Sequence, residues 1–427
     1  MELNIFDTAA VLLVLAAVFA YINHRVFRLP FTIGMMLSGL AASLVVLLSD
    51  ALFPDLGLGA AARDAVADID FTESLMHGML SFLLFAGAMH VNLNDLLARR
   101  GPILSLASVG VLISTAIVGG LSYGLFQAID AGVPFAYCLV FGALISPTDP
   151  IAVLGIMKSV GAPKSLEVKI AGESLINDGF GVVVFTTLLA VAAGGSHGHG
   201  HGDSITAGFL IQMFSIEVLG GIALGIFGGW LCYWAMSTID EPNLEVLFSF
   251  ALVFGMTFFA FQVHTSAPLA CVVAGLFIGN KGRRLAMSDR VREALDVVWA
   301  FIDEALNAVL FLLVGLELVV LRFTGDAIAA AVLMIPIALL ARLISVAAPV
   351  ALMSALRHEF NPGAIRVLTW GGLKGGISVA LAMSLPAFPG RDTVLAATYA
   401  VVVFSIVVQG LTVAPMIRRL TSQESAS

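Results

Sequence analysis

Charged residues are scarce in this sequence. Only 12% of its 427 residues are Asp, Glu, Lys or Arg, whereas an average soluble domain has about 25%. A chain with so few charges cannot cover a folded surface with polar groups, and 59% of its residues are hydrophobic. Lipid is therefore predicted to be its main solvent, which excludes the soluble globular classes.

Other absences narrow the choice further. There is no basic arm or other nucleic-acid signature, so no nucleic-acid partner is expected. Cys138, Cys232 and Cys271 lie in apolar runs, which predicts buried thiols without a metal site or disulfide framework. The phosphate-binding pattern GxxxxGK(S/T) is missing, so ion gradients and not nucleotides are expected to supply energy. No cofactor is expected.

Long apolar runs dominate what is present. A bilayer core needs about 20 apolar residues per helix, and the first run lacks the basic start and cleavage site of a signal peptide. Cutting the chain at Pro, Gly and charge clusters predicts thirteen spans, at 7–24, 30–50, 71–92, 101–127, 133–157, 163–193, 205–236, 243–263, 266–281, 289–320, 325–356, 363–387 and 391–418. The predicted fold class is an all-α polytopic membrane protein.

The basic residues give an orientation. With the N-terminus outside, the loops assigned to the inside hold sixteen of the 21 Lys and Arg, whereas the outside loops hold only Arg63, Arg322 and Arg391. Cytoplasmic loops collect basic residues, so the C-terminus and its short tail, 419–427, are predicted to be cytoplasmic in a cell membrane. The outside loop at 194–203 contains His197, His199 and His201, and is interpreted as a flexible loop more readily than as a metal or pH site.

A charge in mid-span is a functional hypothesis by default, and the fifth span carries the first. In ALISPTDPIAVLGI, at 143–156, Pro147 and Pro150 bracket Thr148 and Asp149. Each proline removes a backbone donor and clashes with the preceding turn, so the helix should break there. A broken helix with an acid at the break is typical of a transporter binding site. A plain proline kink is the alternative.

The sixth span carries four polar residues within two turns, in GESLINDG at 172–179. Glu173 and Asn177 are at i, i+4, as are Ser174 and Asp178, so the four form one polar stripe. Polar contact between helices is the alternative, but two acids exceed what such contact needs. The stripe therefore predicts a functional site.

Two further spans contain a cation. Arg342 stands alone in the eleventh span and needs an anionic partner, for which Glu173 is predicted; an arginine that reaches the interface is the alternative. Lys374 lies among four glycines in TWGGLKGGISVALAMSLP, at 369–386, which are predicted to interrupt the twelfth span. Where two broken helices cross, Asp149 and Lys374 would compensate the partial charges of the helix ends.

The tenth span has acids at both ends. Asp303, Glu304 and Asn307 are expected near its start, and Glu317 near its end. They fit either ordinary interface residues or an acidic vestibule that attracts cations; Glu73 fits the interface better.

Asp149 and Asp178 can each hold a cation or a proton, with Ser174 and Thr148 as neutral oxygen ligands. Because the two ions need the same oxygens, their competition gives exchange if only loaded forms reorient. Hard oxygens suit a small dehydrated ion such as Na⁺ or Li⁺. An intramembrane aspartyl protease also needs two membrane acids, but neither residue lies in a YD or GxGD setting, and no filter-like loop indicates a channel.

The sequence resembles the monovalent cation/proton antiporters, in particular the NhaP-like sodium/proton branch. The blocks that carry the resemblance are SPTDP (146–150), GESLINDG (172–179), LLFAGAMHVNLNDLL (83–97), FIDEALNAVLFLLVGLEL (301–318) and WGGLKGGISVALAMSLP (370–386). The resemblance extends over about 10–418. It implies a secondary transporter, not an enzyme, that works as a homodimer with a core domain moving against a dimerisation domain. It also implies two inverted repeats, at about 7–193 and 243–418, joined by the span at 205–236.

The resemblance also implies residue roles. Asp178 would be the principal cation- and proton-binding carboxylate, with Asp149, Thr148 and Ser174 nearby, and Glu173 and Arg342 the buried ion pair. Asn177 is similar to the residue that marks the electroneutral branch, which implies one Na⁺ for one H⁺. A K⁺/H⁺ or broad-selectivity antiporter is the alternative.

Two positions depart from the family pattern. Many relatives carry an acid where this chain has Ala86, which removes one potential cation ligand. Relatives often have Arg where Lys374 stands, and a lysine amine titrates where a guanidinium does not. The crossover is therefore predicted to be more sensitive to pH.

Overall fold

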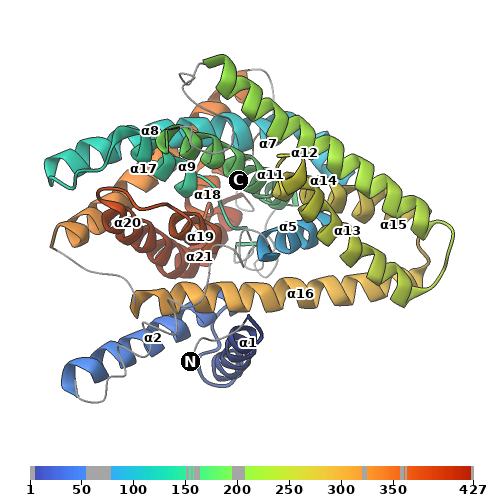
Figure 1. Ribbon diagram of the computed structural model, residues 1–427, viewed down its shortest axis with the longest axis horizontal. Helices are drawn as coiled ribbons and strands as arrows, with labels where there is room; N and C mark the ends of the chain where they lie inside the picture. Colours follow the sequence, from blue (N-terminus) through green and yellow to red (C-terminus); the bar gives the residue numbers. More distant parts are fainter. Residues whose placement is uncertain are drawn as a thin grey trace.

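The computed structural model describes residues 5–53, 78–150, 153–154, 157, 164–194, 207–319, 325–355, 360 and 363–424. Within these ranges the secondary structure is helical, and β pairing is limited to one isolated antiparallel bridge, between Asp149 and Leu373. Figure 1 shows helices running in several directions around a centre where two of them are interrupted.

The first half of the chain supplies α1 (Ile5–Ile22), α2 (Phe31–Leu52), α5 (Leu80–Met89), α6 (Leu93–Ala98), α7 (Arg100–Leu104), α8 (Gly110–Ala128), α9 (Phe135–Ile145) and α11 (Lys164–Ala192). The second half supplies α12 (Ala207–Met236), α13 (Pro242–Gln262), α14 (Ala267–Phe277), α15 (Arg283–Leu285), α16 (Asp289–Leu316), α17 (Gly325–Ala355), α18 (Ala364–Trp370), α19 (Gly376–Met383), α20 (Arg391–Phe404) and α21 (Gly410–Glu424).

Each of the thirteen predicted spans coincides with a helix or an interrupted pair. Among the described residues, nine helices are long and apolar enough to cross a bilayer. The other four predicted spans contain the shorter helices α5, α9, α14 and α19. Helices α13 and α14 are separate, which confirms the division near residue 264.

Five-residue π-helical turns interrupt several of these helices. One at Ser105–Val109 joins α7 to α8, and one at Ser405–Gln409 joins α20 to α21. Single π turns recur at functional sites because they widen the helix and re-aim its side chains. The turn at Ser405–Gln409 lies against the second helix break, described below.

The buried apolar residues form several clusters. The largest joins α8, α9, α11, α17 and α20, and another joins α5, α12, α13, α14 and α16. Helix α16 crosses the molecule, with α1 and α2 on one side of it (Figure 1). It approaches α2 closely enough that a Cβ placed on Gly315 would lie 2.7 Å from Gly39 Cα, so both positions require glycine for this backbone contact.

Large apolar side chains cover much of the outside. Helix α12 exposes Phe227, Trp230, Leu231 and Trp234, and α1 exposes Leu13 and Val14. Soluble monomers rarely expose contiguous apolar surface of this kind. Together with the long apolar helices, this surface identifies a polytopic membrane protein.

Candidate cation and proton site

Two interrupted helices cross at the centre of the molecule. Helix α9 ends at Ile145, and the chain continues through Ser146–Pro150 without helical structure; α18 ends at Trp370, and α19 begins only at Gly376. The backbone N–H of Asp149 donates to the carbonyl oxygen of Leu373 at 2.8 Å. The crossover predicted from prolines and glycines is therefore present, with one antiparallel bridge holding the two extended segments together.

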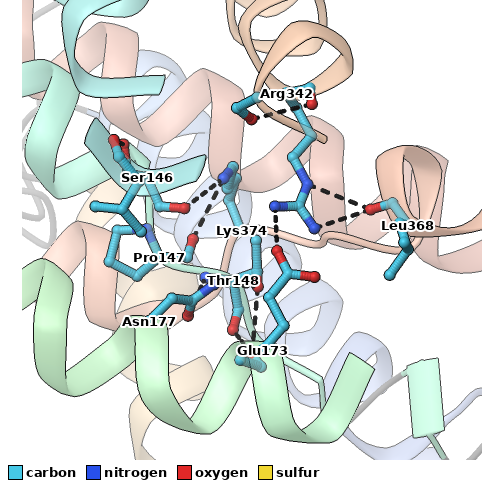
Figure 2. Close-up of polar contacts among 11 residues, drawn as sticks. Ser146, Pro147, Thr148, Glu173, Asn177, Arg342, Leu368 and Lys374 are labelled. Atoms are coloured by element: carbon cyan, nitrogen blue, oxygen red, sulfur yellow. Dashed lines mark hydrogen bonds and ion pairs between the residues drawn. The ribbon is translucent and has the colours of Figure 1, made fainter. Parts of the chain in front are cut away.

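Lys374 compensates the end of the first broken helix. Its ammonium group donates to the carbonyl oxygens of Ser146 at 3.0 Å and Pro147 at 3.3 Å (Figure 2). These carbonyls follow the last turn of α9, where helix dipoles leave partial negative charge. Only 4% of Lys374 is exposed, so the interaction occurs without solvent screening.

Asp149 lies beside the N-terminus of α19, the second half of the other broken helix. A Cβ placed on Gly375, the residue before α19, would be 2.6 Å from Asp149 Oδ2. The carboxylate therefore lies against the backbone at a helix N-terminus, where partial positive charge stabilises an anion. The acid and the base occupy opposite kinds of helix end, as predicted from the sequence.

The structure brings Glu173 and Arg342 together. Arg342 Nη1 lies 2.6 Å from Glu173 Oε1, and both residues are buried. The same guanidinium donates from Nε and Nη2 to the carbonyl oxygen of Leu368, at 3.2 and 2.9 Å (Figure 2). Arg342 thus ties α11 on one side to the last turn of α18 on the other.

Thr148, Ser174 and Asn177 hydrogen-bond to one another. Asn177 accepts from the Thr148 N–H at 3.3 Å and donates to Thr148 Oγ1 at 2.9 Å, while the Ser174 hydroxyl donates to the Thr148 carbonyl. None of the three is on the wall of the adjoining cavity. All three are predicted from the sequence to belong to the cation- and proton-binding site, and in this arrangement their hydrogen bonds fasten α11 to the first break.

The cavity beside the crossover has a volume of about 510 Å³ and has Asp149 and Asp178 on its wall. Asp178 is 6% exposed, and its Oδ1 has no hydrogen-bond partner in the described part of the chain. A buried carboxylate oxygen without a donor is costly unless a proton or cation occupies the site. This makes Asp178 the group best placed to bind an ion.

The opposite end of the cavity carries hydrophilic residues. Its wall there includes His90, Asp95, Lys164 and Glu167, and Lys164 Nζ lies 3.5 Å from Asp95 Oδ2. These residues belong to the loops and helix ends that the charge distribution assigned to the inside. The cavity therefore connects the two carboxylates with that side of the molecule.

Sequence reasoning misplaced several ionisable residues. Asp303 lies halfway along α16, whose first residue is Asp289, and not near the start of the span; it faces the cavity. Lys169 is one of the sixteen basic residues that the charge distribution assigns to the inside loops, but it is buried in α11, with its ammonium 4.3 Å from the centre of the Phe360 ring. Glu317 is 4% exposed and not an ordinary interface residue.

Other functional features had no sequence signal that we recognised. The hydroxyl of Ser405, in the π turn, accepts from the Lys374 N–H at 2.8 Å, and Gln409 donates to the Trp370 carbonyl at 3.1 Å. Glu217 lies within α12 and accepts a hydrogen bond from Thr186 at 2.9 Å. A mid-span acid is itself a signal, and Glu217 could have been found in that way.

Ala86 is fully buried near Phe85 and Trp299. The residues of α5 on the cavity wall are Leu83, Leu84, Gly87 and His90. Position 86 is therefore not on the wall, so its lack of an acid removes no ligand from the cavity in this conformation. Glu73 and the histidines at 197, 199 and 201 lie outside the described residues.

Comparisons with known proteins agree with this geometry. The family model described as sodium/hydrogen exchanger, transmembrane, matches residues 13–419. The Na⁺/H⁺ antiporter NhaP of Pseudomonas aeruginosa is 46% identical over 418 residues, which cover 97% of this chain and 96% of that protein. The Na⁺/H⁺ antiporter NhaH of Halobacillus dabanensis is 36% identical, covering 82% of this chain and 84% of that one.

A solved structure shares the fold at low sequence identity. The sodium proton antiporter MjNhaP1 of Methanocaldococcus jannaschii superimposes with a TM-score of 0.77 at 16% identity, covering 98% of this chain and 99% of that one. The crossed, interrupted helices, the polytopic fold and the family match over almost the whole length agree, and the chain belongs to the sodium/hydrogen exchanger family.

Proposed function

We propose that this protein is a secondary active antiporter that exchanges Na⁺, or Li⁺, for H⁺, and that cation and proton compete for Asp178 and Asp149. The observation that supports this most directly is the unpartnered oxygen of buried Asp178 on a cavity that it shares with Asp149. Two relatives that match most of the chain are named Na⁺/H⁺ antiporters. In this proposal the protein is a transporter and not an enzyme, and it uses no resident cofactor.

Competition for the carboxylates couples the movement of the cation to that of the proton. A cation displaces the proton from Asp178, and a proton displaces the cation, so the site is always neutralised when it crosses the low-dielectric centre. The uncompensated carboxylate is the form that cannot move, because burying a naked charge is expensive. Alternating access to the two sides then couples the two gradients.

Asn177 supports a stoichiometry of one cation per proton. Its amide does not titrate, and its side chain is used to hold Thr148. Asp178 is then the proton carrier of α11, assisted by Asp149, and each cycle would move one charge in each direction.

We place the N-terminus outside and the C-terminus in the cytoplasm of the cell membrane, so the cavity faces the cytoplasm. The repeats, at about 7–193 and 243–418, would each contribute one broken helix, with the span at 205–236 between them. A homodimer embedded in lipid is the proposed assembly, and the exposed aromatic residues of α12 fit either lipid or a second subunit.

Transport in membrane vesicles tests the proposal. Proton flux driven by Na⁺, Li⁺ and K⁺ is measured with a pH-sensitive dye, with and without an imposed potential. Na⁺ and Li⁺ are expected to drive flux at a rate that ignores the potential. Flux with K⁺ alone would establish the alternative selectivity, and a rate that follows the potential would contradict the one-to-one exchange.

The essential variant is Asp178→Asn, which keeps the shape of the side chain and removes its charge. It is expected to abolish cation-driven proton flux, because an amide can neither release a proton nor neutralise the cation. Asp130→Asn, at an exposed loop residue with φ 53°, is the matched control and should transport normally. Retained flux in Asp178→Asn would refute the mechanism.

A further inference from the structure

A further carboxylate, that of Asp303 on α16, lines the cavity that holds Asp149 and Asp178. Helix α16 presents Asp303, Asn307 and Leu310 to the cavity wall, at i, i+4 and i+7 on one helical face. Leu310 lies against Gly376, the first residue of α19, because a Cβ there would be 2.7 Å from Leu310 Cδ2. The face therefore runs from the crossover towards the mouth.

The depth of Asp303 follows from helix geometry. It is seven residues from Leu310, a rise of about 10 Å along the helix axis. Because Leu310 is level with the break that holds Asp149, Asp303 lies about two turns from the crossover. An ion that travels between Asp178 and the mouth passes this carboxylate.

Asp303 lines the cavity and is held in position by Asn307. Asn307 Nδ2 donates to Asp303 Oδ1 at 3.0 Å and to its backbone carbonyl at 2.8 Å. No Lys or Arg forms an ion pair with Asp303 among the residues described. The nearby imidazole of His90 contacts the Ala86 carbonyl through Nδ1 at 2.8 Å, and its Nε2 lies 3.9 Å from Asp296.

The neighbouring acid differs in exposure. Glu304 is exposed and absent from the cavity wall, whereas Asp303 is half-buried and lines it. Among the described residues, Asp149 and Asp178 also contribute carboxylates to this wall, and Asp178 is more than nine-tenths buried with an oxygen that accepts no hydrogen bond from them. Asp303 and these two acids therefore line the same cavity.

We propose that Asp303 is a further cation-binding carboxylate beside Asp149 and Asp178, which receives monovalent cations on the cavity side and passes them to and from Asp178. This inference rests on the proposed antiport function. Helix α16 packs mainly with α2, α5 and α13 and also contacts α19 of the crossover, while Asp149 follows α9 and Asp178 lies on α11. Asp303 therefore acts on one side of the membrane only, because reorientation of the α9–α11 group closes this cavity.

The test is the sidedness of the Michaelis constant for Na⁺. Asp303→Asn is measured in vesicles that present either the cavity side or the opposite side to the added Na⁺. On the cavity side the KM is expected to rise about three- to tenfold, because the variant removes the carboxylate that binds the entering cation directly. From the opposite side the KM and the maximal rate should stay at the parent values.

Glu304→Gln is the matched control, since it removes the same charge from the adjacent exposed residue. Its KM should equal that of the parent on both sides. The effect of Asp303→Asn should also persist when choline chloride raises the ionic strength, because a bound ion is not screened as a distant field is. An unchanged cavity-side KM, a rise on both sides, or a rise that disappears with salt would each overturn the proposal.

Asn307→Ala covers the case in which Asp303→Asn does not fold. It keeps the Asp303 carboxylate and removes the amide that donates to Asp303 Oδ1 and to its backbone carbonyl, so the cavity-side KM should rise about twofold; an unchanged KM would count equally against the proposal. Failure of the antiport function itself is recognised separately, because the parent protein would then show no Na⁺-driven proton flux, or Asp178→Asn would retain it.

Discussion

The two helix breaks at the centre of the molecule are built from opposite kinds of residue. In the first, Pro147 and Pro150 remove backbone donors, which leaves carbonyl oxygens that need a cation. In the second, glycines keep their N–H groups and remove side chains, which leaves room for charged groups to lie against the backbone. Each break therefore supplies what the other lacks.

This difference explains the exchange of charged residues between them. The glycine break provides Lys374 for the carbonyls of Ser146 and Pro147, and the proline break provides Asp149 for the space beside Gly375. A lysine within the proline break itself would need a further turn of the chain before its ammonium group could reach these carbonyl oxygens. The pairing of unlike breaks is what makes the crossover neutral and stable in lipid.

The largest expected effect comes from removing the anchor of the glycine break. Arg342→Ala would leave the Glu173 carboxylate and the Leu368 carbonyl buried without a partner, and should lower the free energy of unfolding by about 3–5 kcal/mol. Unfolding in mixed micelles measures this. Arg283→Ala is the control, because its pair with Asp296 is more than one-third exposed and should be worth under about 1 kcal/mol. Equal losses would show that burial is not the cause.

The next effect concerns the proline break. Lys374→Met would leave the Ser146 and Pro147 carbonyls without their donor and should cost about 2–3 kcal/mol of unfolding free energy. Lys374→Arg keeps the charge and should fold. Because a guanidinium stays charged at alkaline pH, the exchange activity of Lys374→Arg is expected to persist to higher pH than that of the parent. Coincident pH profiles would contradict a titrating role for Lys374.

A smaller effect is expected from the glycine that faces Asp149. In Gly375→Ala the new Cβ would lie 2.6 Å from Asp149 Oδ2, so the carboxylate must move and exchange should slow, with a cost of about 1–2 kcal/mol. Gly120→Ala, in α8, has no atom within 4 Å of the new Cβ and should stabilise by about 0.5–1 kcal/mol. The comparison fails if both variants exchange ions equally well.

The smallest effect separates the two roles considered for Thr148. Thr148→Val removes the acceptor for Asn177 and should lower the unfolding free energy by about 1 kcal/mol while changing the KM for Na⁺ less than about twofold. Thr148→Ser, which keeps the hydroxyl, should match the parent. A large rise in KM at unchanged stability would instead make the hydroxyl a direct ion ligand.

Much of the architecture could be predicted from the sequence, because it depends on length and burial. Apolar runs long enough for a bilayer can be counted, and prolines and glycines locate the breaks. The partner of Arg342 could be inferred since an isolated cation in lipid needs an anion, and Glu173 is an acid within the polar stripe of a neighbouring span. These arguments need no knowledge of how helices rotate.

What could not be predicted depends on rotation and on local geometry. Inside a break the chain has no helical period, so nothing in the sequence says that Thr148 turns towards Asn177. The π turn at Ser405–Gln409 shifts the register of one helix without a distinctive residue. Asp303 was expected near the start of the span at 289–320, but it lies halfway along α16, which begins at the same residue as that span, because the polar first half of the helix continues directly into the apolar half.

The close glycine contact between α2 and α16 holds these two helices together. The Ser43 hydroxyl donates to the Gly315 carbonyl at 2.8 Å, across the same point at which Gly39 and Gly315 bring the two backbones together. Sliding one helix past the other would break that hydrogen bond where no water can replace it, and would drive backbone into backbone. Helices α2 and α16 are therefore held together as one rigid unit, and in the proposed mechanism this pair would be the fixed frame against which Asp149 and Asp178 move.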